Sequence, residues 1–344
     1  MPHLLSIDRF LKSKAPLVDV RSPAEFFKAH IPRAINLPLL SDEERAEVGT
    51  LYKNKGTDKA LLRGLDFVGP KMSTIVASFL AIAPQRSIRL YCWRGGQRSQ
   101  SVAWLLEQAG FQVEVLSGGY KAFRGWVLNT FEQGHRFRVL GGLTGVGKSD
   151  ILRGLKQRGA QVLDLEEEAH HRGSAFGGIG QPEQPSTQQY ENKLAMRLSS
   201  FDDQRPVWLE DESRLVGRCA VPDALFQQMM LSQFFVLSRT VDDRIERLCR
   251  LYGVEQKNSL IAACLRIKKR LGLEQTKRAV ALIERGELAE ATRIFLKYYD
   301  KKYQYSIDKR SVSLFLSGTE YSDAQIVEDL LNWKSRDQNN PGTL

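Results

Sequence analysis

The chain has 344 residues, enough for two domains of ordinary size, and its 42% hydrophobic and 26% charged residues are typical of a folded globular protein rather than a disordered or fibrous one. No uninterrupted apolar run approaches the roughly 20 residues of a membrane-spanning helix, so we expect no membrane partner and a cytoplasmic location. The four cysteines, Cys92, Cys219, Cys249 and Cys264, form no Cys-x-x-Cys pair, which argues against a disulfide framework and a zinc site.

Positive charge is concentrated in two blocks of a chain whose formal net charge is +10. Residues 1–127 contain 18 Lys and Arg against 11 Asp and Glu, and residues 240–310 contain 17 against 10, whereas residues 128–239 contain 13 against 14. Such blocks favour a polyanionic partner, of which nucleic acid is the commonest large one.

The N-terminal part alternates between strands and helices. A β-branched run at 17–20 leads into a Ser22-Pro23 helix start, a brief helix and a strand bounded by prolines. Further strands are predicted at 87–91 and 112–116, each followed by a helix. This alternation predicts a parallel sheet with helices on its faces, in a first domain of residues 1–127.

A second α/β series begins at Phe137 and defines a second domain, residues 128–344. Its strands are predicted at 137–143, 161–166, 206–211, 233–238 and 312–317. Residues 240–310 have helical periodicity and no strand candidate, so we expect a basic helical insertion between the last two strands.

A reactive cysteine is predicted where the strand at 87–91 ends. Cys92 is followed by two glycines and the start of a helix, where backbone N–H groups converge and can hold an anion. Nearby arginines should lower the pKa of the thiol and make Cys92 nucleophilic. The anion cradle that we expect around this catalytic residue consists of Arg94, Gly95, Gly96, Arg98 and Ser99.

Two chemistries fit this Cys-x5-Arg loop. It could bind a phosphomonoester for attack by sulfur, as in dual-specificity phosphatases, or it could hold a persulfide or a related chalcogen species.

A phosphate-binding loop is predicted at the start of the second domain. The segment GLTGVGKS, residues 142–149, satisfies the G-x-x-x-x-G-K-[ST] pattern, follows an apolar strand and opens a helix. Lys148 would neutralise phosphate charge and the Ser149 hydroxyl could bind Mg²⁺. The phosphate-binding residues are predicted to be Gly142, Thr144, Gly145, Gly147, Lys148 and Ser149.

Acidic residues at two other strand ends are candidates for metal or substrate binding. The acidic candidates are Glu210, Asp211 and Glu212 at the strand 206–211, and Asp164 and Glu166 at the strand 161–166. A glycine-rich loop after the latter adds His171 and Arg172 as anion or substrate contacts, and Arg214 completes the set. These residues alone assign no metal.

The first domain resembles a rhodanese domain over nearly its whole length. The matching segments are VDVRSPAEFFKAHIPRAINLPL, CWRGGQRS and GFQVEVLSGGYKAFR, and the opening signature is matched by Asp19, Arg21, Glu25, His30, Ile31, Pro32 and Asn36. Arg33 stands where this family usually has glycine. The Cys92 loop is also one residue longer than the common Cys-x4-Arg form, which keeps the phosphatase alternative open.

With the segments EERAEVGTLY, HRGSAFG and EDESRLVG, the chain from about residue 5 to 335 resembles the tRNA 2-selenouridine synthase family. The resemblance implies an α/β fold in which a rhodanese-like parallel-sheet domain precedes a P-loop NTPase-like domain with a helical insertion. It also implies a transferase that replaces the sulfur of wobble 2-thiouridine in tRNA by selenium from selenophosphate. The implied intermediate is an S-geranylated uridine made from geranyl diphosphate.

The same resemblance implies roles for both loops. Cys92 would engage the incoming selenium, and the loop 142–149 would bind the diphosphate of the prenyl donor or selenophosphate. Both compounds are substrates, so no tightly bound cofactor is expected, and Mg²⁺ is an optional ion. The implied partners are the anticodon loop of tRNA and an enzyme that supplies selenophosphate.

Binding of tRNA would fall to the basic insertion. The RNA-binding candidates are Lys268, Lys269, Arg270, Lys301 and Lys302, and the last two are interleaved with tyrosines that could stack unpaired bases.

Two other functions are compatible with these motifs. A phosphatase fused to a nucleotide switch would release phosphate from an aryl phosphate without RNA. A small-molecule kinase with a rhodanese-like docking domain would turn over ATP even after Cys92→Ser. A non-catalytic scaffold is disfavoured because both loops keep their reactive residues.

Overall fold

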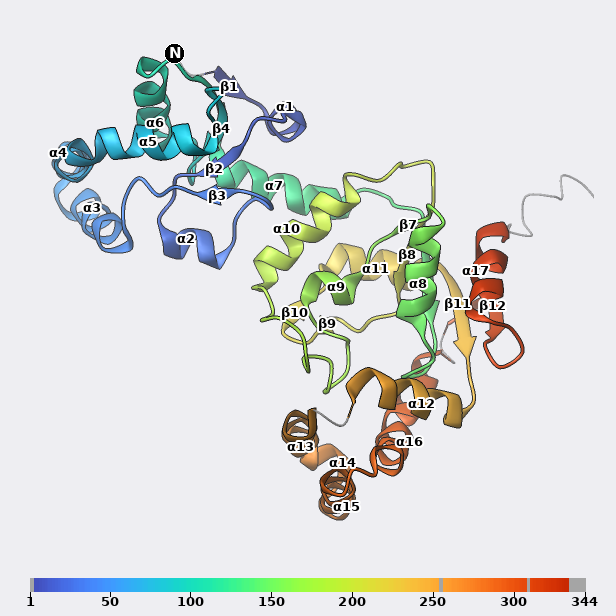
Figure 1. Ribbon diagram of the computed structural model, residues 1–344. Coiled ribbons are helices and arrows are strands. Elements are labelled where there is room, and N and C mark those ends of the chain that lie inside the picture. Colours follow the sequence, from blue (N-terminus) through green and yellow to red (C-terminus); the bar gives the residue numbers. More distant parts are fainter. Residues whose placement is uncertain (1–2, 254–255, 308–309, 334–344) are drawn as a thin grey trace, which may run out of the picture. The chain divides into compact units, whose positions relative to one another are not determined.

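The computed structural model describes residues 3–253, 256–307 and 310–333 (Figure 1). The chain forms two compact units, Met1–Phe131 with Gln188–Met196, and Glu132–Thr187 with Arg197–Leu344. The boundary expected at residue 127 falls inside helix α7 (Gly119–Glu132), and no sequence signal indicates that Gln188–Met196 packs with the first unit.

The first unit is built on a five-stranded parallel sheet in the order β1-β5-β4-β2-β3, so the parallel sheet predicted for this part of the chain is confirmed. Its strands are β1 (His3–Leu5), β2 (Leu17–Asp19), β3 (Ile35–Asn36), β4 (Ser87–Tyr91) and β5 (Gln112–Leu116). Its helices are α1 (Ile7–Lys12), α2 (Pro23–Lys28), α3 (Asp42–Lys55), α4 (Thr57–Val68), α5 (Met72–Ile82), α6 (Gln97–Gln108) and α7.

Helices α4 and α5 are joined by a 3-10 turn, Gly69–Lys71, into an apolar segment from Thr57 to Ile82. By length and composition this segment could cross a membrane, which on its own is weak evidence for a membrane span. Phe79 of α5 is 1% exposed and packs in the core of the first unit against the sheet.

The second unit contains the five predicted strands in a parallel sheet of order β12-β11-β6-β8-β7. They are β6 (Phe137–Gly141), β7 (Gln161–Val162), β8 (Val207–Glu210), β11 (Gln233–Ser238) and β12 (Val312–Ser317). Because β6 lies between β8 and β11, the loops that follow these three strands meet at one edge of the sheet, where open α/β sheets bind ligands.

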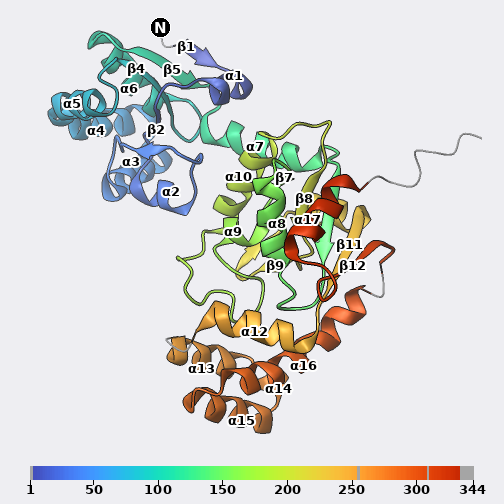
Figure 2. The same ribbon diagram turned by 45° about the vertical axis from the view of Figure 1, so that its right-hand side comes forward.

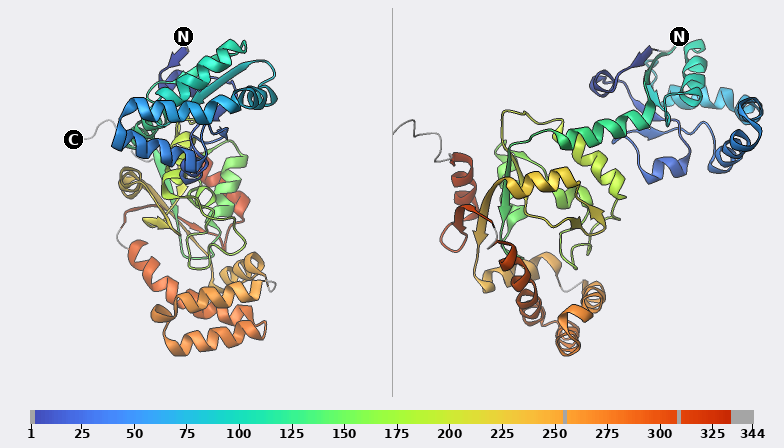
Figure 3. Two further views of the ribbon diagram at one scale, coloured as in Figure 1. Left: turned by 90° about the vertical axis from the view of Figure 1, so that its left-hand side faces the viewer. Right: turned by 180° about the vertical axis from the view of Figure 1, so that it is seen from behind.

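Helices cover both faces of this sheet. On one face α8 (Lys148–Gln157) and α17 (Asp323–Asn332) lie side by side (Figure 2). On the opposite face α11 (Asp223–Leu231) packs on β6 (Figure 3). The remaining elements of this unit outside the insertion are α9 (Leu165–Ala169) and an antiparallel pair, β9 (Leu215–Val216) and β10 (Cys219–Ala220). Helix α10 (Thr187–Leu198) belongs to the first unit over Gln188–Met196.

The predicted helical insertion is confirmed between β11 and β12. It comprises α12 (Val241–Tyr252), α13 (Lys257–Arg266), α14 (Lys268–Leu271), α15 (Leu273–Glu284) and α16 (Leu288–Ile307). These helices form a layered group at one end of the second unit (Figure 3). They have a core of their own, in which Leu260, Ile283 and Phe295 pack against Phe176.

The strand predicted at 161–166 is wrong beyond Val162. Asp164 caps α9 instead, because its Oδ1 accepts a hydrogen bond from the Glu167 backbone N–H at 2.8 Å. Glu166 therefore lies in the first turn of a short helix and not at the end of a strand.

Candidate functional site

Cys92 lies directly after β4, at the entrance to the loop that opens α6. Its side chain is buried, with Sγ 3.2 Å from Ser99 Oγ and 4.0 Å from the Gly96 carbonyl oxygen. Two of the predicted cradle residues therefore lie beside the sulfur. The Ser99 hydroxyl donates to the Gly96 carbonyl at 3.1 Å, which leaves its oxygen to accept a hydrogen bond from the Cys92 thiol.

Two glycines allow the turn after β5 to pack against the Cys92 loop. Gly95 has a φ of 66°, and a Cβ there would lie 2.6 Å from the Leu116 carbonyl oxygen. Gly119 has a φ of 59°, and a Cβ there would overlap the Gly95 nitrogen. Tyr120 N–H also donates to the Cys92 carbonyl at 2.8 Å. The shape of the cysteine loop thus depends on the turn beside it.

The two cradle arginines differ in their surroundings. Arg94 is exposed, whereas Arg98 Nη1 lies 2.6 Å from Glu25 Oε2. Burial raises the pKa of Glu25, but the contact with Arg98 outweighs it and leaves the pKa below its ordinary value. The charge of Arg98 is therefore balanced by a carboxylate, whereas Arg94 is exposed to solvent.

Part of the family signature has a structural role. Asp19 and Arg21 are both buried, with Arg21 Nη2 2.6 Å from Asp19 Oδ2. The guanidinium lies 4.0 Å from the centroid of the Tyr120 ring and also donates to the Ala29 carbonyl at 2.8 Å. This pair ties the end of β2 to the elements around the cysteine loop.

The predicted phosphate loop connects β6 with α8. Its glycines Gly142, Gly145 and Gly147 have φ values of 140°, 83° and 92°. A Cβ at Gly142 would overlap the Leu237 carbonyl oxygen, so that position requires glycine. Lys148 Nζ donates to the Gly142 carbonyl at 3.2 Å, which folds the lysine back over the loop.

Two arginines that belong to no sequence motif, the half-buried Arg239 and the buried Arg244, contact the carbonyls of this loop. Arg239 Nε donates to the Val146 carbonyl at 2.8 Å, and Arg244 Nε donates to the Thr144 carbonyl at 2.8 Å. Arg244 is 1% exposed and also pairs with Asp300 at 2.6 Å. The arginines thereby satisfy the carbonyls of Thr144 and Val146, while the Val146 N–H donates to the Leu143 carbonyl at 3.3 Å.

A third arginine, Arg247, lies against Gly147, where a Cβ would be 2.5 Å from Nη2. It pairs with Asp150 at 2.6 Å and with Asp323 at 3.0 Å. The only sequence signal for these contacts is the spacing of Arg244 and Arg247, which places both on one face of α12.

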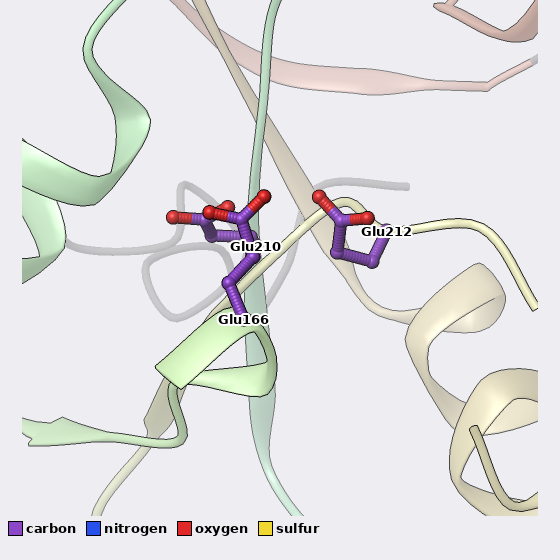
Figure 4. A group of neighbouring side chains, drawn as sticks. All are labelled: Glu166, Glu210 and Glu212. Atoms are coloured by element: carbon purple, nitrogen blue, oxygen red, sulfur yellow. The ribbon is translucent and has the colours of Figure 1, made fainter. Parts of the chain in front are cut away.

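Three carboxylates converge beside the phosphate loop. Glu166, Glu210 and Glu212 each bring an oxygen to within 4.8 Å of the others (Figure 4). Glu210 is 1% exposed, and its Oε1 has no hydrogen-bond partner among the described residues. Because a buried oxygen without a donor is unfavourable, this carboxylate trio fits a hard divalent cation such as Mg²⁺.

Crowding within the trio changes the protonation of its members. Burial, followed by the charges of Glu210 and Glu212, raises the pKa of Glu166 to about 10. Burial and Glu210 raise the pKa of Glu212 to about 8. Burial lowers the pKa of Lys148, but Tyr303 and the three glutamates outweigh it and raise the pKa above its ordinary value. Without a cation, the trio therefore holds protons near neutral pH.

The loop after α9 closes over the trio. Gly173 is so close that a Cβ there would lie 2.8 Å from oxygens of Glu166 and Glu212. His171 packs against Gly177, and burial followed by the charge of Arg266 lowers its pKa, which keeps the imidazole neutral.

Three of the remaining candidates are engaged with other groups. Asp211 pairs with the half-buried Arg310 at 2.6 Å, so it is not part of the trio. Arg214 pairs with Asp223 at 2.9 Å on the surface. Arg172 donates to a backbone carbonyl of its own loop at 3.3 Å.

One open cavity of about 1980 Å³ brings most of the predicted residues of the second unit together. From the predictions, its lining includes Thr144, Gly145, Gly147, Lys148, Ser149, Asp164, Glu166, His171, Arg172, Glu210, Asp211, Glu212, Arg214 and Arg270. Of the RNA-binding candidates, Lys268, Lys269 and Lys301 are exposed outside this lining, and the side chain of Lys302 lies outside the described residues.

Comparison with known proteins covers both units. Residues 6–125 match the family model of the rhodanese-like domain, and residues 135–334 match that of the tRNA 2-selenouridine synthase AAA domain. The chain is 38% identical to the tRNA 2-selenouridine synthase of Bordetella bronchiseptica, with 94% of this chain and 95% of that protein covered. It is 34% identical to the protein of the same name from Shewanella pealeana, with 93% and 96% covered. These matches confirm the predicted fold class.

Proposed function

The chain belongs to the tRNA 2-selenouridine synthase family of tRNA-modifying enzymes, and we propose that it uses selenophosphate and an S-geranylated intermediate to replace the C2 sulfur of wobble 2-thiouridine by selenium. The observation that carries the proposal is the similarity along both units. Each unit keeps a reactive loop, Cys92 after β4 in the first and Lys148 after β6 in the second.

The second unit is assigned the geranyl transfer. The C2 sulfur of the base attacks C1 of geranyl diphosphate, the C1–O bond breaks, diphosphate leaves and the N3 proton goes to solvent. The loop N–H groups and the Lys148 ammonium stabilise the charge that develops on the diphosphate. A phosphate loop can serve this step without nucleotide hydrolysis, because a departing diphosphate needs the same cationic surroundings.

A Mg²⁺ ion held by Glu166, Glu210 and Glu212 is part of the proposal. Such an ion would neutralise diphosphate charge when bound. The support is the unpartnered, buried Oε1 of Glu210 and the 4.8 Å spacing of the three ligand oxygens.

The first unit is assigned the activation of selenophosphate. Cys92 Sγ attacks phosphorus, the P–Se bond breaks and hydrogen selenide leaves; water then cleaves the S–P bond and releases phosphate. The selenide attacks C2 of the geranylated base, and the C2–S bond breaks to release geranyl thiol. Every step is a substitution, so no oxidant or reductant is required.

The tRNA anticodon loop is assigned to the basic insertion. Lys268, Lys269 and Arg270 are exposed on α14, where they can contact phosphates, and Lys301 is exposed on α16. Tyr298 lines the large cavity on the same helix and offers a ring for base stacking.

The proposal is tested with purified protein, 2-thiouridine-containing tRNA, geranyl diphosphate and selenophosphate, followed by mass spectrometry of the nucleosides. Cys92→Ser should abolish 2-selenouridine and leave S-geranyl-2-thiouridine largely unchanged. Lys148→Ala should abolish both products, whereas Arg158→Ala, at the exposed end of α8, should preserve both. Equal loss of both products in Cys92→Ser contradicts the assigned division of labour.

The same protein preparation distinguishes the alternative functions. Phosphate release from an aryl phosphate by Cys92 without tRNA would favour the phosphatase. ATP turnover that survives Cys92→Ser would favour the kinase.

A further inference from the structure

A narrow apolar cavity lies directly behind the wall of the large phosphate cavity. Its volume is about 50 Å³, several times the roughly 10–15 Å³ that one water molecule needs. The two cavities share the wall residues Thr144, Ser174, Leu248, Tyr252 and Tyr299. Because Thr144 belongs to the phosphate loop, the apolar cavity begins where a bound diphosphate would end.

Hydrocarbon makes up most of the lining of this cavity. Buried Phe176, Leu260, Ile283 and Phe295 converge from four segments of the second unit, and the rings of Phe176 and Phe295 lie 4.7 Å apart. The phenol oxygen of Tyr299 is already used, since it accepts a hydrogen bond from the Ala175 N–H at 3.2 Å.

We propose that this cavity, called here the tail pocket, binds the apolar chain of an organic diphosphate whose diphosphate group is held by the phosphate loop. The inference rests on the proposed geranyl transfer and deepens it by assigning the site that recognises the donor's chain. A nucleobase would leave its donors and acceptors unpaired against this lining, whereas an unbranched or methyl-branched chain makes only the contacts that the lining offers.

Leu248 joins the tail pocket to the phosphate loop. Its Cδ1 lies 2.9 Å from the position of a Cβ on Gly145, and the side chain lines both cavities. The chain of a bound donor would therefore pass along Leu248 as it leaves the phosphate loop. Ala291 and Phe295 of α16 also line the tail pocket, so the size of these two side chains limits the chain that can enter.

Calorimetric titration with inorganic diphosphate, geranyl diphosphate and the longer farnesyl diphosphate tests the tail pocket. We expect wild-type protein to bind geranyl diphosphate at least about tenfold more tightly than inorganic diphosphate, because each buried methylene group adds affinity. Ala291→Leu fills the pocket and should remove this preference while leaving the affinity for inorganic diphosphate unchanged. The matched control is Ala289→Leu, the same change at an exposed position of α16, which should alter neither affinity.

A second variant covers the case in which Ala291→Leu does not fold. Phe295→Leu enlarges the pocket and should raise the affinity for farnesyl diphosphate relative to geranyl diphosphate. Equal affinities of the wild type for geranyl and inorganic diphosphate would overturn the tail pocket even if geranyl transfer to tRNA occurs. A chain-dependent affinity without any geranyl transfer would keep the tail pocket and reject the proposed function.

Discussion

Arg98 and Glu25 form an ion pair beside the cysteine loop, with Nη1 2.6 Å from Oε2. The same carboxylate oxygen accepts a hydrogen bond from the Ser22 N–H at 3.2 Å, which completes the capping box of α2. One side chain thus connects the start of α2 with the start of α6, which carries the anion cradle.

Glu25→Gln keeps the shape of this side chain and removes its charge. We expect the free energy of unfolding to fall by about 1–2 kcal/mol at neutral pH. Burial raises the pKa of Glu25, but Arg98 outweighs it, so the folded-state pKa lies below 4.5. The stabilisation is therefore present above pH 4.5 and is lost as the pH falls through the folded-state pKa. Urea denaturation of both proteins across this range should show the curves converging in acid; a constant difference contradicts the assignment.

Glu212→Gln relieves the crowding in the carboxylate trio. Burial and Glu210 raise the folded-state pKa of Glu212 from 4.5 to about 8, so the stability of the metal-free protein falls as the pH rises between these values. We expect the variant to melt a few degrees higher than the wild type at pH 8 in EDTA.

The response of the melting temperature to Mg²⁺ tests whether the carboxylate trio binds this ion. Scanning calorimetry should show that Mg²⁺ raises the melting temperature of the wild type and of Glu246→Gln, a surface control, but not that of Glu212→Gln. An equal response of all three proteins would reject the trio as the ion's site.

Arg244→Ala removes the donor to the Thr144 carbonyl and the partner of Asp300. Because Arg244 is 1% exposed, we expect a loss of about 3 kcal/mol in the free energy of unfolding. Binding of inorganic diphosphate should also weaken, since the phosphate loop loses its anchor. Arg285→Ala, also in the helical insertion, serves as the control, because its side chain is 62% exposed and lies outside the lining of the large cavity. A folded Arg244→Ala protein with unchanged diphosphate affinity would show that the loop keeps its shape without this anchor.

Replacement of Lys268, Lys269 and Arg270 by Glu tests the RNA footprint. If these residues contact phosphates, tRNA affinity should fall and the salt dependence of binding should flatten by about one unit of slope per lost contact. Filter binding across a salt series measures both quantities. The charge-matched control replaces Lys53, Lys55 and Lys59, which are exposed on α3 and α4, by Glu. Identical slopes for the wild type and the α14 variant would remove α14 from the footprint.

The sequence predicts those parts of the fold and site that are contiguous in the chain. Strand β11 matches the predicted 233–238 because a buried parallel strand is a continuous apolar run with clear ends. Strand β12 matches the predicted 312–317 at the edge of the sheet, where more and less exposed side chains alternate. The strand at 161–166 was predicted too long because Asp164 caps a helix, and capping competes with strand extension.

The rest of the site depends on packing between distant segments. Cys92 and Lys148 can be recognised as site residues from the sequence because their loops carry local patterns. By contrast, Arg244 contacts Thr144 of the phosphate loop, which lies 100 residues earlier in the chain. The approach of Glu166 to Glu210 likewise depends on how α9 folds back after β7. Periodicity and spacing predict which residues share a face of one helix or strand, but they do not predict contacts between distant segments.

Residues Gln188–Met196 belong by their contacts to the first unit, although the chain on either side of them belongs to the second. Asn192 Nδ2 donates to the Tyr120 phenol oxygen at 2.8 Å and to the His30 carbonyl at 2.9 Å. A single cut in the gene therefore cannot yield two intact halves. A fragment that stops after Phe131 lacks residues Gln188–Met196. To restore the complete first unit, these residues would have to be added as a separate peptide or fused to the end of α7.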